Sequence, residues 1–252
     1  KAEQITILHI NDHHSHLKPD KRMTLMLDGK STRVRSGGMP AVVAKIKELE
    51  STSNNVIKLH AGDAISGSLF FTLFKGEADA ALMNEICFDA FVLGNHEFNE
   101  GDKGVAKFID FLKSEKCSTS VLAANIKPEV GVSPLTPNSE TDYIQPYTII
   151  EKGGMKVGII GIDIVKKTIM SSSPDETTKF LDEAKTSQKI VNELKKSGVK
   201  HIILLTHYGY ENELELASTI EGVDVIIGGD SHTLLGDFDK LGLNAAGPYP
   251  TI

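Results

Sequence analysis

The sequence predicts a layered α/β fold with mixed β-sheets. Along its 252 residues, short apolar runs of strand length alternate with amphipathic stretches of helical period, and Gly, Asp or Asn marks the switches between them. Two of the runs, residues 147–151 and 155–162, are separated only by Lys152, Gly153 and Gly154, which predicts a β-hairpin. The alternation indicates layers of helices and sheet, and the hairpin adds an antiparallel pair of strands.

Strands and helices follow one another in turn through the first half of the chain. Short apolar runs predict strands at residues 5–10, 56–59, 90–93 and 120–124. Apolar residues at helical spacing predict helices at residues 38–51, 77–88 and 103–116. In the first of these helices, Met39, Val43 and Ile46 fall on one face, so we expect that face to pack against a sheet.

The second half continues the alternation after the hairpin. The spacing predicts a long helix over residues 178–197, with Phe180, Ala184 and Val191 on its buried face and Gly198 after its end. We further expect strands at residues 201–205 and 223–227 and a short helix over 213–220. Residues 127–146 are rich in Pro, Ser, Thr and Glu, so we expect a surface loop there and the best internal boundary.

The charge balance excludes nucleic acid as a partner. The chain has 27 Lys plus Arg against 34 Asp plus Glu, a formal net charge of −7, and no basic stripe along which a phosphate backbone would bind. An anionic substrate would therefore need another source of positive charge. No apolar run approaches the roughly 18 to 20 residues of a transmembrane helix, so no transmembrane segment is expected.

Two further features concern the compartment. Cys87 and Cys117 are too few for a disulfide framework or a thiolate metal site, and the sequence leaves open whether they pair. The chain begins at Lys1 without a basic segment followed by an apolar one. We therefore expect that any secretory signal has been removed or never existed.

Five polar clusters each follow a predicted strand directly. They occupy residues 11–14, 61–63, 94–97, 206–207 and 228–232. Ligands of α/β sheets bind beyond the carboxyl ends of the strands, so we expect the five clusters to converge on one site. Their carboxylate, imidazole and amide groups are ligands for Zn, Mn, Fe or Mg rather than for a metal that prefers thiolates.

Each cluster also has a plainer explanation. An Asp-x-His at a strand end is commonly a helix cap or a hydrogen-bonded turn, and Gly62-Asp63 alone is an ordinary turn dipeptide. Gly94-Asn95-His96-Glu97 is more specific, because no amphipathic pattern accounts for these residues after a buried strand. The joint occurrence of all five clusters at strand ends is what favours a metal site.

The remaining histidines and glycine motifs are expected to be structural. We expect His9 and His201 to be hydrogen-bonded core or interface imidazoles, His60 either to orient a metal ligand or to be structural, and His13 and His16 to face solvent or neighbouring loops. Residues 29–32 resemble part of a phosphate-binding loop but lack its upstream glycine, so they predict a hairpin turn. Gly158 and Gly161 lie inside a strand and indicate close sheet packing.

Taken together, the clusters resemble those of a known family. Asp12-x-His14, Gly62-Asp63, residues 94–97, His207 and residues 229–232 follow the order of motifs in the calcineurin-like metallophosphoesterases, and within them in the catalytic domain of 5′-nucleotidases. Residues 67–74 and 229–232 are similar to the secreted bacterial branch that includes NAD nucleotidases. The resemblance implies a layered metallophosphoesterase fold with mixed β-sheets sandwiched by helices. It also implies that residues 1–252 form one catalytic domain, without the family's C-terminal nucleotide-binding domain.

The resemblance also implies a site with two divalent metal ions of uncertain identity, Zn, Mn, Fe or Mg. Asp12, His14 and His232 would hold one ion, Asn95, His207 and Asp230 would hold the other, and Asp63 would bridge them. Two cations would supply the positive charge that the acidic chain lacks, clamp phosphate oxygens and lower the pKa of a bound water. His96 would be the catalytic residue that hydrogen-bonds a phosphate oxygen or protonates the leaving group.

Two positions depart from the family pattern. Asp230 stands where the family usually has His, although the NAD nucleotidase branch is similar here. Asn99 stands where the family pairs the catalytic His with an Asp. Asn orients the imidazole but does not favour its protonated form, so we expect a slower enzyme or one with a more acidic optimum.

The expected function is hydrolysis of nucleoside 5′-phosphates to nucleoside and phosphate, as in 5′-nucleotidases. Alternatives are cleavage of NAD or another nucleotide pyrophosphate, cleavage of a 2′,3′-cyclic nucleotide, action on smaller phosphate esters, or a metal-binding scaffold with weak catalysis. The absence of Trp and an aromatic content of 6% fit the lack of an aromatic nucleoside clamp. The resemblance implies nucleotide catabolism in the periplasm or at the cell surface, and the family's C-terminal domain as a partner in a longer protein.

Overall fold

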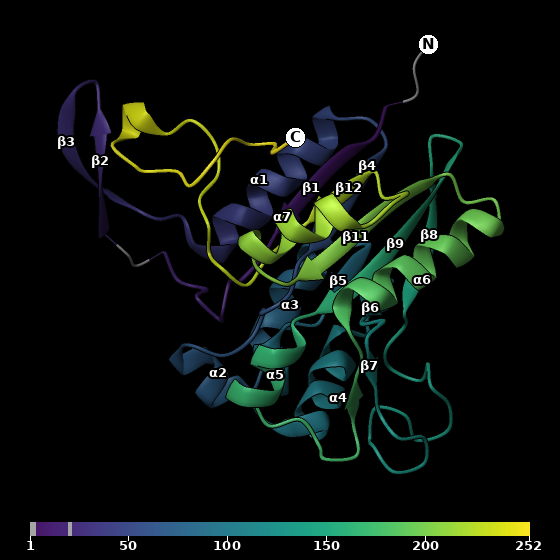
Figure 1. The fold of residues 1–252 in the computed structure, drawn as a ribbon. Coiled ribbons are helices and arrows are strands. Elements are labelled where there is room, and N and C mark those ends of the chain that lie inside the picture. The colour runs from purple at the N-terminus through teal and green to yellow at the C-terminus, as the bar shows by residue number, and fades with distance from the viewer. Residues whose placement is uncertain (1–3, 20–21) are drawn as a thin grey trace.

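The computed structural model describes residues 4–19 and 22–252, so Lys1 lies outside the described residues. Two four-stranded sheets lie face to face, with helices over their outer faces (Figure 1). The first sheet, in spatial order, contains β1 (Thr6–Ile10), β4 (Val56–His60), β5 (Ala90–Val92) and β6 (Ser120–Leu122). The second contains β12 (Val225–Ile227), β11 (His201–His207), β9 (Met155–Asp163) and β8 (Tyr147–Lys152).

The direction of the strands places their ends. All neighbours in the first sheet are parallel, and in the second β9, β11 and β12 are parallel while β8 pairs antiparallel with β9. The β8–β9 pair is the hairpin that the two glycines predict. The expected α/β fold with mixed sheets between helices is therefore confirmed.

Helices cover both outer faces of the sandwich. Over the first sheet lie α1 (Gly38–Thr52), α3 (Glu77–Ile86) and α4 (Gly101–Leu112), and over the second lie α6 (Glu183–Lys196) and α7 (Tyr210–Thr219). The shorter elements are β2 (Arg22–Leu27), β3 (Lys30–Arg35), α2 (Leu69–Phe74), β7 (Ile126–Lys127), α5 (Val165–Ser171) and β10 (Lys179–Phe180). Two 3₁₀ turns, Asn95–Phe98 and Asp239–Leu241, complete the described elements.

Strand β9 shows how the sequence builds three core layers. Its odd-numbered residues Val157 and Ile159 pack between the two sheets, while Ile160 and Ile162 pack against α6 and α7. Because side chains alternate across a strand, a continuous apolar run is what a strand buried on both faces requires. A third cluster fills the space between the first sheet and helices α1, α3 and α4.

The helix expected over residues 178–197 is wrong at its beginning. Lys179 and Phe180 instead form β10, which pairs with β7, and α6 starts after Asp182, whose side chain accepts a hydrogen bond from Lys185 N. Phe180 packs into the cluster beneath the first sheet, whereas Ala184 packs into the cluster beneath α6. The helical spacing of apolar residues thus ran through both β10 and α6, although these two elements pack into different core clusters.

The expectation of a surface loop and internal boundary at residues 127–146 is also wrong in part. The segment is mostly irregular, but Leu135 and Ile144 are buried in the core cluster of α4, and Ser133 Oγ donates to Asp102 Oδ2 of that helix at 2.5 Å. It therefore packs onto the sandwich. The hairpin expected at residues 29–32 is present between β2 and β3, but its turn lies at Asp28 and Gly29, and residues 30–32 already belong to β3.

Cys87 and Cys117 form a disulfide, which answers the question that the sequence left open. The bond joins the end of α3 to the segment that leads into β6, across 30 residues of chain. Among residues 4–19 and 22–252, none of the helices has the length and apolar character needed to cross a membrane.

The two glycines of β9 predict different tolerances to substitution. A Cβ at Gly161 would overlap Leu122 Cβ and approach Leu122 C to 2.8 Å, so the inserted methyl group meets the neighbouring sheet's backbone. A Cβ at Gly158 would meet mainly the Leu194 Cδ1 methyl, at 2.9 Å, which can move. We expect Gly161→Ala to lower the free energy of unfolding by about 2 to 3 kcal/mol more than Gly158→Ala, measured by urea denaturation. Equal losses would contradict this account of the sheet contact.

Candidate metal centre

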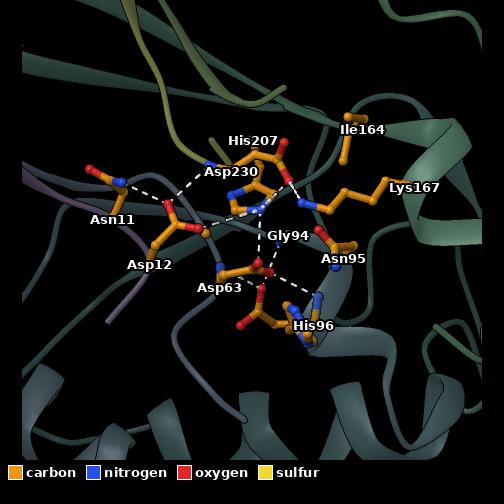
Figure 2. A network of polar contacts seen from close by, with 12 residues as sticks. Asn11, Asp12, Asp63, Gly94, Asn95, His96, Ile164, Lys167, His207 and Asp230 are labelled. Carbon is orange, nitrogen blue, oxygen red and sulfur yellow. Dashed lines mark hydrogen bonds and ion pairs between the residues drawn. The ribbon is translucent and has the colours of Figure 1, made fainter. Parts of the chain in front are cut away.

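The five polar clusters meet at one edge of the sandwich, as the strand ends predict (Figure 2). Loops after β1, β4, β5 and β12 carry Asp12, Asp63, Asn95 and Asp230, while His207 is the last residue of β11. The parallel strands of both sheets end here, which brings together side chains from positions 12 to 232. Convergence is thus a consequence of strand direction.

The backbone at this edge is unusual. Five of the seven candidate ligands have positive φ angles: Asp12 (51°), His14 (46°), Asp63 (53°), Asp230 (78°) and His232 (50°). Left-handed backbone is uncommon outside glycine and costs free energy, so it persists only where surrounding contacts hold it. Its concentration here indicates loops shaped for the positions of their side chains.

One group of candidate metal ligands lies around Asp12 Oδ1. His232 Nε2 lies 3.2 Å from this oxygen and His14 Nε2 lies 3.5 Å from it, and the two imidazole nitrogens are 3.1 Å apart. The three ligand atoms lie within 4.8 Å of one another, which suits a single cation. His232 is the exposed member of the group, so the group opens toward solvent.

A second group gathers around His207, which is fully buried. Its Nε2 lies 3.0 Å from Asp63 Oδ2 and 3.6 Å from Asp230 Oδ1. Its Nδ1–H donates to the carbonyl oxygen of Ala61 at 2.7 Å, so in the neutral ring the Nε2 lone pair faces the carboxylates. This is the orientation in which a histidine binds a metal ion.

Unpaired polar atoms test whether a cation fits here. Within residues 4–19 and 22–252, both amide atoms of Asn95 are buried without a hydrogen-bond partner, and Asp12 Oδ1 and His207 Nε2, which also lack a hydrogen bond, have only the close carboxylate–imidazole contacts given above. Buried polar groups without partners are costly and rare, so four at one place call for a common partner. A divalent cation with oxygen and imidazole ligands would satisfy them, and the donor set therefore fits the expected metals.

The electrostatics of the second group favour positive charge. Burial alone would lower the pKa of His207, but the charges of Asp63 and Asp12 raise it to about 10. Burial would raise the pKa values of Asp12 and Asp63, yet the neighbouring histidines and hydrogen bonds lower both below their ordinary values. Asp12 and Asp63 thus favour positive charge at His207.

His96 lies beside both groups. Its backbone N–H donates to Asp63 Oδ1 at 2.8 Å, and its ring meets that of His14 edge to face, with centroids 5.0 Å apart. Asn99 Nδ2 lies 2.9 Å from His96 Nδ1 and donates to it, so the neutral ring carries its proton on Nε2. Burial lowers the pKa of His96. Asn99 is itself held by Ser66 Oγ at 2.9 Å.

Glu97 has a role that the sequence did not reveal. This buried carboxylate accepts four backbone N–H groups: Gly94 and Asp63 on Oε2 at 2.6 and 2.9 Å, and Ala64 and Ile65 on Oε1 at 2.8 and 3.3 Å. It thereby joins the loop after β4 to the loop after β5. Burial and the charge of Asp63 raise its pKa to about 8. Its position in a motif without amphipathic character was the only signal available.

A buried polar chain supports the loop after β1 from below. Gly62 N–H donates to His60 Nδ1 at 3.2 Å, so His60 Nε2–H donates to His13 Nδ1 at 2.9 Å, and His13 Nε2–H donates to Asp79 at 3.0 Å. Asp79 also accepts from Ser15 Oγ at 2.9 Å. The prediction that His13 faces solvent or a neighbouring loop is therefore wrong, because its ring lies between His60 and Asp79 in this series of hydrogen bonds. His60 is fully buried, in keeping with either role expected for it.

The other histidines divide. His16 is exposed, as expected. His9 Nε2 lies 2.8 Å from Tyr249 Oη, which matches a hydrogen-bonded imidazole at an interface between segments. His201 is exposed at the beginning of β11, so the expectation of a core or interface imidazole is wrong there. Its backbone is paired with Val157 of β9, but its side chain reaches solvent.

Lys167 is a further residue that the sequence did not single out. It lies on α5, the helix after β9, and its ammonium makes an ion pair with Asp230 Oδ1 (Figure 2). The positive charge of Lys167 also contributes to the lowered pKa of His96, after the larger effect of burial. One ammonium thus lies near a candidate metal ligand and near the candidate catalytic histidine.

Comparisons with known proteins agree with this geometry. Residues 5–234 match the family described as calcineurin-like phosphoesterase. The chain is 43% identical over 249 residues to a probable 5′-nucleotidase of Treponema pallidum and 46% identical over 237 residues to the NAD 5′-nucleotidase of Haemophilus influenzae. These matches cover 98% and 94% of this chain but only 40% and 37% of the two relatives.

The fold has a solved counterpart. The structure of the Haemophilus influenzae NAD nucleotidase superposes with a TM-score of 0.88 at 44% identity, covering 97% of this chain and 46% of that one. The sandwich and its site-bearing edge thus correspond to a region of a larger protein.

Glu97→Gln tests the carboxylate that joins the two loops. The amide nitrogen of Gln cannot accept the two N–H groups that one carboxylate oxygen accepts, so buried donors lose their partner. We expect the free energy of unfolding of the metal-free protein to fall by about 2 to 4 kcal/mol, measured by urea denaturation in EDTA. Glu100→Gln, at an exposed carboxylate nearby, is the control and should change little. Similar effects of both variants would refute the structural role of Glu97.

Proposed function

The chain belongs to the calcineurin-like phosphoesterase family, and from that premise we propose that it hydrolyses nucleoside 5′-phosphates to nucleoside and phosphate with two divalent metal ions. The observation that carries the proposal is the set of unpaired buried atoms on Asp12, Asn95 and His207 at the ends of parallel strands. A site built for structure alone would pair these atoms within the protein. The names of the two relatives support a nucleotide as the substrate.

The proposed ligand sets follow the two groups of donors. Asp12, His14 and His232 would hold one ion, while Asn95, His207 and Asp230 would hold the other. Asp63 would contribute to both, and its contacts with His207 and His14, at 3.0 and 3.8 Å, support a position between the groups. Zn, Mn, Fe and Mg all suit these donors. When bound, the two cations supply Lewis acidity and positive charge for a phosphoryl group and for the water that attacks it.

His96 is the proposed catalytic residue of the chain itself. Its Nε2–H faces away from Asn99 and donates to a phosphate oxygen or to the oxygen of the leaving nucleoside. Asn99 is the proposed orienting residue, since its amide fixes the ring through Nδ1. Asp63 holds the backbone of His96, so the imidazole and the bridging carboxylate keep a fixed relation.

A second candidate activity is cleavage of NAD or another nucleotide pyrophosphate. The observation that favours it is the 46% identity to the NAD 5′-nucleotidase of Haemophilus influenzae. The same cations would serve a 2′,3′-cyclic nucleotide or a smaller phosphate ester. A periplasmic or cell-surface location is proposed as well, and the Cys87–Cys117 disulfide supports an oxidising compartment.

Phosphate release tests the proposal directly. EDTA-treated protein should be inactive toward p-nitrophenyl phosphate and AMP, and added Mn or Zn should restore activity. His96→Ala should lower kcat by about 10²-fold while the protein still binds two metal ions per chain, because the imidazole stabilises the transition state without being needed as a ligand.

His201→Ala is the matched control, since His201 is exposed at the opposite end of a strand that leads to the site. Comparison of AMP, NAD and 2′,3′-cyclic AMP ranks the candidate substrates. Two bound metal ions with no turnover of any phosphate ester would favour the scaffold alternative and overturn the proposed activity.

Asn99→Asp tests the effect of the neutral partner on His96. A carboxylate at position 99 would accept a hydrogen bond from Nδ1–H of the imidazolium and raise the pKa of His96, whereas the Asn99 amide nitrogen donates to Nδ1 and does not. If His96 donates a proton to the leaving group, activity falls as pH rises through its pKa. The alkaline limb of the kcat profile should therefore shift upward by about one pH unit in the variant. Superimposable profiles would contradict the proposed effect of Asn99 on the pKa of His96.

A further inference from the structure

We propose that Lys167 is a phosphate-binding residue of this site, whose ammonium is held by Asp230 until a cation takes over that carboxylate. The inference rests on the proposed function and adds a residue to it. Strand β9 ends at the same edge as the other parallel strands, yet it contributes none of the seven proposed metal ligands. The next element along the chain is α5, which carries Lys167.

Helix α5 is fixed to the site through its neighbours. Thr168 Oγ1 donates to the buried Asp163 at 2.6 Å, and Asp163 N donates to Asn125 Oδ1 at 3.0 Å. At the other end, Ser172 Oγ lies 2.6 Å from the carbonyl oxygen of Asn95 and donates to it. The backbone of α5 therefore keeps its place beside the 3₁₀ turn that bears Asn95 and His96.

The side chain of Lys167 is partly exposed, whereas its backbone is fixed in α5. It is 42% exposed, whereas its partner Asp230 is 11% exposed. Within the described ranges, Asp230 is the one ion-pair and hydrogen-bond partner of the Lys167 ammonium. A flexible four-carbon stem on a fixed helix allows the ammonium to change partner without moving the loop.

Charge decides which partner the ammonium takes. A divalent cation bound by His207 and Asp230 would share the Asp230 oxygen that Lys167 now contacts, and the two positive charges repel each other. The ammonium would then need another anion, and a phosphoryl group bound beside the cations would be the anion at hand. Lysine is a frequent phosphate ligand in proteins, acting as a compact point charge.

The pairing also accounts for an aspartate at position 230. A carboxylate there adds negative charge to a site that already contains Asp12 and Asp63. The ammonium of Lys167 balances that charge in the absence of metal and returns as a phosphate ligand in its presence. One residue thereby serves both states of the site.

Calorimetry with Lys167→Met tests both halves of the proposal without measuring turnover. EDTA-treated protein is titrated with Mn²⁺, and the metal-loaded protein is then titrated with inorganic phosphate. We expect Lys167→Met to bind Mn²⁺ at least as tightly as the natural chain, because a competing charge is removed, and to bind phosphate at least about tenfold more weakly. Lys166→Met, at an exposed lysine on the same helix, is the control and should leave both constants within about twofold.

The outcomes separate the two proposals. Unchanged phosphate affinity in metal-loaded Lys167→Met would overturn the role of Lys167 and leave the proposed function standing. Parallel losses of Mn²⁺ and phosphate affinity would also overturn it, since they would show that Lys167 merely maintains the shape of the site. If the natural chain binds no Mn²⁺, Zn²⁺ or Mg²⁺, the proposed function is wrong. The proposal that the Lys167 ammonium changes its partner from Asp230 to phosphate is then wrong as well.

Discussion

The gathering of three carboxylates around one buried imidazole is the constraint on which the site depends. Asp12, Asp63 and Asp230 come from three different strand ends, and their oxygens lie 3.9, 3.0 and 3.6 Å from His207 Nε2. Two groups that favour or supply positive charge lie among them: the buried imidazole of His207, whose pKa the charges of Asp63 and Asp12 raise, and the ammonium of Lys167. The site is thus arranged for positive charge before any cation arrives. That arrangement favours positive charge at one edge of a chain whose net charge is −7.

The direction of the strands places the candidate ligands, and hydrogen bonds between the loops hold them there. Parallel strands in two facing sheets carry their carboxyl ends to the same edge, while Glu97 joins two loops through four backbone hydrogen bonds. Beneath them, the chain from Gly62 through His60 and His13 to Asp79 connects the site with helix α3. The positive φ angles of the candidate ligands cost free energy, and these contacts hold the residues in that conformation.

The chain is similar to one part of larger proteins. The chain spans 40% and 37% of the length of two similar nucleotidases. The two departures noted in the sequence acquire structural meaning within the chain. Asn99 lies against the candidate catalytic imidazole, and Asp230 has a lysine partner on the helix after β9. Each departure therefore has a neighbour whose charge or hydrogen bond it changes.

The sequence by itself determined the layers of the fold and the convergence of the candidate ligands, because both follow from local patterns and strand direction. Apolar runs specify strands such as β9, and polar residues directly after them must lie at the strand ends. Only the tertiary structure decided which residues meet across long separations. Phe180 joined a different core from Ala184, His13 found Asp79, and Lys167 found Asp230. Spacing along a chain reports local conformation, whereas the partner of a buried charge is set by packing between elements far apart in the sequence.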